Sequence, residues 1–98
     1  RRDRLRGRFV RLVVALGSFW EQQQKYGQAL ECYRHSLEAD ASSEELCRHL
    51  MSCLMTLDRH AEALAVFEQC RRNLLATLGV EPSPATLTLV NTIRAACR

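Results

Sequence analysis

Apolar residues recur along this chain at the three- and four-residue spacing of amphipathic helices. Val13, Leu16 and Trp20, for example, stand at positions i, i+3 and i+7, which share one face of a helix. Breakers and short polar runs separate such segments from one another. The pattern predicts an all-α chain with helices at about residues 3–24, 26–39, 44–57, 59–78 and 84–97.

The ends of these helices are expected from local chemistry. Ser42 or Ser43 is expected to cap the third helix, because two glutamates follow in its first turn, where the helix dipole favours acidic groups. Asp58 is the expected cap of the fourth helix. Gly27 is expected close to the turn between the first two helices.

The stretch "LGVEPSP", residues 78–84, holds both prolines and one of the four glycines. Gly79 can take the left-handed conformation that closes a helix. Pro82 lacks an N–H, Ser83 is a good N-cap, and Pro84 suits the first position of a helix. We therefore predict a stiff linker at 79–83 that directs one more helix toward the others. The apolar face of that last helix is expected to comprise Leu87, Val90, Ile93 and Cys97.

The chain also repeats itself. When residues 26–40 are laid over 60–74, Ala29 and Tyr33 fall on Ala63 and Phe67. This shift matches the period of tetratricopeptide repeats, about 34 residues, in which helix–turn–helix units must stack to bury their apolar faces. The predicted repeat core comprises Leu16, Trp20, Ala29, Tyr33, Leu50, Leu54, Ala63 and Phe67.

The chain thus resembles a tetratricopeptide-like array of about five helices, two helix pairs and a final helix. Repeat 1 is expected at about 10–43 and repeat 2 at about 44–78. The second repeat departs from the family pattern, because Met51 replaces the packing glycine and Asp58 the turn glycine. These departures predict an irregular array.

In such arrays the first helix of each pair lines a groove. The resemblance implies groove positions at Arg11, Val14, Ser18 and Glu21 in the first repeat and at Glu45, Arg48, Ser52 and Met55 in the second. Apolar side chains exposed in a groove are candidate contacts, and the alternative is that a further unit covers them. The set mixes arginines with glutamates, which gives little support to a clamp for a carboxylate.

Cysteine usage bears on the compartment. The five cysteines are odd in number and form no C-x-x-C pair, which argues against a disulfide framework or a zinc ribbon and favours a reducing, cytoplasmic location. Each is expected to act as a small packing residue. The longest uncharged run, residues 12–20, is too short for a membrane-spanning helix.

Charge is uneven along the chain. Residues 1–11 carry six arginines and one aspartate, and such a basic segment can bind nucleic acid or an acidic partner. The alternative that we favour is the solvated face of a helix start, because no aromatic residue is interleaved before Phe9.

Catalytic motifs are not found in the sequence. It has no glycine-rich phosphate loop, H-E-x-x-H pair or nucleophile elbow. His35, His49 and His60 have no ligand spacing on a common helix face. We therefore expect a chain that is not an enzyme and has no catalytic, cofactor-binding or metal-binding residues.

The second repeat and its tail carry a more specific resemblance. The segment "RHAEALAVFEQCRR" followed by "LGVEPSPAT" is similar to bacterial transcriptional activator domains. This resemblance implies a regulatory module within a larger transcription factor, which acts by self-association as a homodimer, by intramolecular control or by contact with the transcription machinery. DNA would then be bound by a separate domain. A general tetratricopeptide peptide-binding scaffold or adaptor is the alternative.

Overall fold

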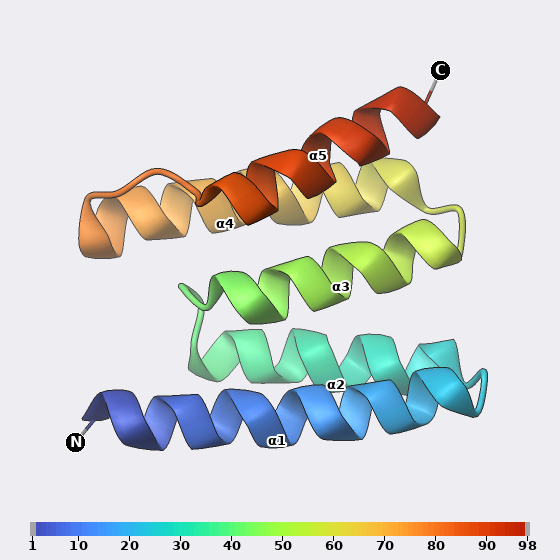
Figure 1. The fold of residues 1–98 in the computed structure, drawn as a ribbon, viewed down its shortest axis with the longest axis horizontal. Coiled ribbons are helices and arrows are strands. Elements are labelled where there is room, and N and C mark those ends of the chain that lie inside the picture. Colours follow the sequence, from blue (N-terminus) through green and yellow to red (C-terminus); the bar gives the residue numbers. More distant parts are fainter. Residues whose placement is uncertain (1, 98) are drawn as a thin grey trace.

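The computed structural model describes residues 2–97, with side chains from residue 4 onward, and its regular secondary structure is helical throughout those residues. Antiparallel helices follow one another as a stack, shown in Figure 1. Helix α3 contacts both α1 and α5. Helix α2 packs between α1 and α3, and helix α4 packs between α3 and α5. This confirms the predicted all-α, tetratricopeptide-like array. The helices are α1 (Arg2–Gln22), α2 (Tyr26–Ala39), α3 (Glu44–Thr56), α4 (His60–Leu78) and α5 (Pro84–Ala96).

The two helix pairs have the same turn. Gln24 and Asp58, which are equivalent positions of the sequence repeat, both have positive φ, 59° and 62°. The following N–H groups of Lys25 and Arg59 donate to the carbonyls of Trp20 and Leu54, each at 2.8 Å. The repeat therefore extends to the backbone of its turns.

The prediction that Asp58 caps α4 is wrong. Arg59 is the N-cap residue, and no side chain caps this helix end. Asp58 instead occupies the left-handed position that glycine takes in a regular repeat, and aspartate tolerates this conformation better than most residues. Gly27 lies in the first turn of α2 rather than at the left-handed position, which Gln24 fills.

Close packing differs between the two pairs. A Cβ atom at Gly17 would collide with the ring of Tyr33, so glycine allows α1 and α2 to approach each other there. The equivalent pair in the second unit is Met51 and Phe67, and both side chains are buried. The second pair thus accommodates a large residue where the first pair has glycine, and the array is irregular in its packing.

Six of the eight predicted core residues are at most 4% exposed, whereas Trp20 is half-buried against the core. The prediction is wrong for Leu16, which is 50% exposed. Within residues 2–97, the face of α1 that carries Leu16 is bordered only by α2, with which it lines an open hollow. Repetition in sequence therefore does not give equal burial at the end of a stack.

The joint before α5 has the predicted geometry. Gly79 closes α4 with φ 66° and ψ 27°, and its N–H donates to the Leu75 carbonyl at 3.0 Å. Pro82 is buried. Ser83 is the N-cap residue of α5 and Pro84 its first residue, but the Ser83 hydroxyl makes no capping bond.

The buried face of α5 differs from the predicted one. Thr86, Val90 and Ile93 are at most 1% exposed, whereas Leu87 is 43% exposed and Cys97 is exposed. A threonine replaces a leucine in the buried row because its hydroxyl enters a polar network with α3.

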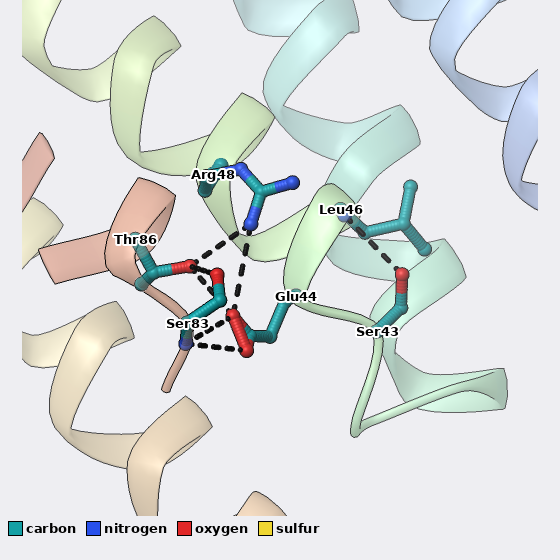
Figure 2. A network of polar contacts seen from close by, with 6 residues as sticks. All are labelled: Ser43, Glu44, Leu46, Arg48, Ser83 and Thr86. Carbon is teal, nitrogen blue, oxygen red and sulfur yellow. Dashed lines mark hydrogen bonds and ion pairs between the residues drawn. The ribbon is translucent and has the colours of Figure 1, made fainter. Parts of the chain in front are cut away.

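This network, centred on Glu44, joins the start of α5 to the start of α3 (Figure 2). Both carboxylate oxygens of Glu44 accept from the Ser83 backbone N–H, at 2.9 and 3.0 Å. The Thr86 hydroxyl donates to Glu44 at 2.8 Å and accepts from the Arg48 guanidinium at 2.9 Å. The carboxylate therefore satisfies the backbone N–H of the N-cap residue Ser83, whose own hydroxyl makes no cap hydrogen bond to α5.

Ionisation of Glu44 is favoured by these partners. Partial burial by itself would raise the pKa of this carboxyl, but the backbone N–H and hydroxyl of Ser83, the Thr86 hydroxyl and the Arg48 guanidinium outweigh it and lower the pKa below its usual value. Ser43, which precedes Glu44, caps α3 by accepting from the Leu46 N–H at 3.3 Å. This agrees with the prediction that Ser42 or Ser43 is the cap.

Two glycines allow a matched test of the α4 terminus. A Cβ would meet no atom within 4 Å at either Gly79 or Gly27, but only Gly79 has positive φ. We expect Gly79→Ala to lower the free energy of unfolding by about 1 kcal/mol through backbone strain, and Gly27→Ala to leave it unchanged or raise it by up to about 0.5 kcal/mol. Equal effects in urea denaturation would show that the left-handed cap is unimportant.

The Glu44 network has a control in the next residue. Glu44→Gln leaves an amide group facing the Ser83 N–H, so we expect a loss of about 1–2 kcal/mol in the free energy of unfolding. Glu45→Gln removes the same charge from the same helical turn at an exposed position, so we expect a loss below about 0.5 kcal/mol. Similar losses in the two variants would argue against the network.

The network also predicts a pH dependence. Because the folded-state pKa of Glu44 is lowered, its contribution is present above the unfolded glutamate pKa of about 4.3 and is lost as the pH falls through the lower folded-state pKa. The unfolding free energy of the parent chain should therefore fall more steeply below this pH than that of Glu44→Gln. Parallel curves for the two proteins would contradict the account.

Candidate interaction surface

The candidate groove positions lie on α1 and α3, two neighbouring helices of the same layer. The repeat shift pairs the positions of α1 with those of α3, so that each helix contributes four residues at equal height. This arrangement places them along one side of the stack. Their assignment to partner binding remains a prediction.

On α1, the four positions differ in exposure. Arg11 is exposed, whereas Val14, Ser18 and Glu21 are half-buried. Glu21 accepts a hydrogen bond from the Tyr33 hydroxyl at 2.6 Å. Burial and then this bond raise the pKa of Tyr33, so the phenol stays protonated and Glu21 is held in place. Glu21 therefore serves the packing of α1 on α2 as well as the surface.

On α3, Glu45 and Ser52 are exposed, while Arg48 and Met55 are half-buried. Arg48 belongs to the Glu44 network and lies 3.7 Å from that carboxylate. Met55 packs against the hydrophobic core, as Val14 does on α1. The two apolar candidates are thus partly covered by the chain itself, and the exposed chemistry of this side is mainly polar.

Helix α5 adds to this side, which the sequence reasoning missed. Arg48, His49 and Ser52 of α3 and Leu89 of α5 line a shallow hollow of about 200 Å³. Glu44 is the first residue of α3 and Pro84 the first residue of α5. The number of residues between them is larger than the repeat shift that relates α1 to α3. This change of period arises mainly because α4, with 19 residues, is longer than α2, with 14, and it hid α5 from a search at the tetratricopeptide period.

Each helix pair has a larger hollow between its two helices. One, of about 640 Å³, is lined by α1 and α2 and includes Val13, Leu16, Trp20 and Cys32. The other, of about 270 Å³, lies between α3 and α4 and is closed on one side by residues of α2 such as Leu37. Both are mainly apolar and open to the surface.

Two of the buried cysteines, Cys47 and Cys53, contribute little reactive chemistry. Cys47, Cys53 and Cys70 are buried as expected of packing residues, whereas Cys97 is exposed and does not fit that prediction. Contact with the Cys70 side chain, together with burial, raises the pKa of Cys47, and burial raises the pKa of Cys53 to about 11. These thiols are protonated near neutral pH and are poor nucleophiles.

The basic segment is exposed where the structure describes it. The side chains of Arg4, Arg6, Arg8 and Arg11 are exposed, and Arg6 lies 3.7 Å from the carboxylate of Asp40 at the end of α2. Arg1 and the side chain of Arg2 lie outside the described residues. Three of these arginines, Arg4, Arg8 and Arg11, share one face of α1 at i, i+4 and i+7.

Two classes of site are not found within residues 2–97. No cluster of three or more histidine, cysteine, aspartate or glutamate side chains could hold a metal ion. None of the five helices combines the length and apolar character that crossing a membrane requires.

Comparison with known proteins identifies the family. The family model of the bacterial transcriptional activator domain matches residues 1–94, which is nearly the whole chain of 98 residues. Searches of the curated proteins and of the solved structures gave no match. The match extends over the helix pairs, the Gly79 joint and most of α5. The chain belongs to the bacterial transcriptional activator domain family, a family of regulatory domains in bacterial transcriptional activators.

Proposed function

We propose that this chain is a non-catalytic protein-interaction module of a bacterial transcriptional regulator. The observation that carries the proposal is the family match over residues 1–94. Its partner is a second copy, another domain of the same regulator or the transcription machinery. DNA is bound by a different domain, and the free cysteines suit a reducing cytoplasm.

The surface chemistry supports an interaction role. Exposed residues of both signs lie along α1 and α3, with Arg11 opposite in charge to its repeat equivalent Glu45. Mixed charges at the edge of a surface mainly determine which partner binds and how fast. The half-buried Val14 and Met55 add apolar area beside them. Such a surface suits a folded protein partner better than a single free carboxylate.

A charge swap on this surface tests the proposal in the full-length regulator. Arg11→Glu combined with Glu45→Arg keeps the net charge but exchanges the two signs. We expect transcription from a target promoter to fall at least about fivefold, the effect of losing roughly 1 kcal/mol at a partner contact. Promoter DNA binding in a gel shift should stay unchanged, because these residues are assigned to a protein partner.

The control is Arg72→Glu, which reverses a charge at another exposed position, on α4. Its transcription should equal that of the parent. Full transcription by the charge-swapped regulator would contradict the proposed groove. A parent protein without any DNA-binding or signalling domain beside this chain would contradict the regulatory role and favour a general peptide-binding scaffold.

A further inference from the structure

The outer side of α1 carries an exposed apolar stripe. Its members follow one another at intervals of four, three, four and three residues, which is the spacing of a helix-packing seam. Each is 37–72% exposed, although leucine and phenylalanine are usually buried. A contiguous exposed row of this kind marks an interaction site. We call it the outer stripe, and it comprises Leu5, Phe9, Leu12, Leu16 and Phe19.

The second repeat shows what covers the residues of α3 that are equivalent to the outer stripe of α1. In α3, the repeat equivalents of Leu12, Leu16 and Phe19 are Leu46, Leu50 and Cys53. These are at most 2% exposed and belong to the same core cluster as Leu30 of α2. Helix α2, which precedes α3 and runs antiparallel to it, packs on α3 (Figure 1).

The third helix of the layer follows the same rule. With Glu44 aligned to Pro84, the matching positions of α5 are Thr86, Val90 and Ile93. They are at most 1% exposed, and the helix that precedes and contacts α5 is α4. In α3 this row packs on the preceding antiparallel helix α2; in α5 it lies against the preceding antiparallel helix α4 and, through Thr86, against α3. The equivalent row of α1 is exposed.

The hollow beside the outer stripe agrees with this template. Val13, Leu16, Cys32, His35 and Ser36 line the hollow of the first pair. Their repeat equivalents line that of the second pair, where Arg34, Leu37, Glu38 and Ala41 contribute a further wall. The volume there is about 270 Å³, against about 640 Å³ in the first pair. A helix placed like α2 would therefore fill the larger hollow with a side chain such as leucine.

The arginines beside the outer stripe indicate the charge that a bound helix should carry. Arg4 and Arg8 are exposed beside the outer stripe in the first half of α1. An antiparallel helix would bring its C-terminal half to this edge, so acidic residues there would be paired. A second copy of α1 would bring no acidic residue from the segment that carries its outer stripe, because residues 4–20 contain none.

We propose that the outer stripe and the adjoining hollow bind one amphipathic helix of a partner protein or domain. This helix lies antiparallel to α1, as α2 lies on α3. It inserts a leucine at the position that Leu37 has in the second pair, and it carries acidic residues in its C-terminal half. The inference rests on the proposed function and deepens it, since it names the surface and the kind of partner.

A peptide with the sequence of residues 26–41 is the probe, because this chain already uses it on α3. A lactam between two exposed positions keeps it helical, so that the cost of ordering does not mask binding. We expect saturable binding by the 98-residue chain, a change in Trp20 fluorescence, and NMR shifts confined to α1 and the facing side of α2. A peptide with Leu37→Glu should not bind.

Two variants of the chain form a matched pair. Leu12→Glu places a charge in the middle of the outer stripe at a residue 72% exposed, and Leu78→Glu makes the same change at one 56% exposed at the end of α4. We expect Leu12→Glu to weaken peptide binding at least about tenfold and Leu78→Glu to leave it unchanged. Circular dichroism should show both variants folded.

Several results would overturn the proposal. These are no binding of the helical peptide at concentrations up to about 1 mM, the range of the weakest specific affinities, shifts located on α5, or equal binding by Leu12→Glu. Sedimentation that shows a dimer dissociated by Leu12→Glu would assign the stripe to a second copy and also overturn it. None of these results would change the outcome of the charge swap in the full-length regulator, so the two proposals fail separately.

Discussion

The structure depends on one packing constraint: the first helix of each pair is apolar on more than one side. One side packs on its own hairpin partner, and another needs the preceding hairpin. Helix α2 meets this need for α3, and α4 meets it for α5. The fully buried Ala29 and Ala63 allow the close approach within each pair. Hydrophobic burial of this kind supplies most of the driving force for folding, so the helices are stable as a stack rather than singly.

Polar contacts then fix the orientation of the last helix. Apolar packing between α4 and α5 is non-directional, whereas the Glu44 carboxylate accepts from one particular backbone N–H at the start of α5. Thr86 and Arg48 complete the arrangement, and Arg48 also borders the shallow hollow next to Leu89. The same contact therefore positions α5 and shapes the neighbouring surface.

Much of the fold could be predicted from sequence because local signals and the repeat agree. Tyr26 and Ala39 begin and end α2 as expected, and Gly79 has the predicted left-handed conformation. Asp58 misled the prediction, since the same residue type suits both a cap and a left-handed turn. The buried residues of α5 were predicted incorrectly because Thr86 is polar and its partner Glu44 is distant in sequence, on another helix. Such a distant pairing has no periodic signal.

The candidate surface was less predictable than the fold. The groove positions follow from the resemblance alone and remain a prediction, and the contribution of α5 was missed because the greater length of α4 makes the last period longer than the first. The exposure of Leu16 was also hidden, because its repeat equivalent Leu50 is 2% exposed. A sequence repeat reports which residues are equivalent, and only the three-dimensional stack reports which of them remain uncovered.

Amide hydrogen exchange of the isolated chain tests the central claim most directly, that each first helix of a pair needs cover from a preceding helix. Residues 12–20 of α1 and 46–54 of α3 are repeat equivalents within two helix interiors, so they are compared segment by segment by mass spectrometry. The account predicts exchange at least about tenfold faster in residues 12–20, because α1 is covered on fewer sides and opens more readily. Equal protection of the two segments would contradict it.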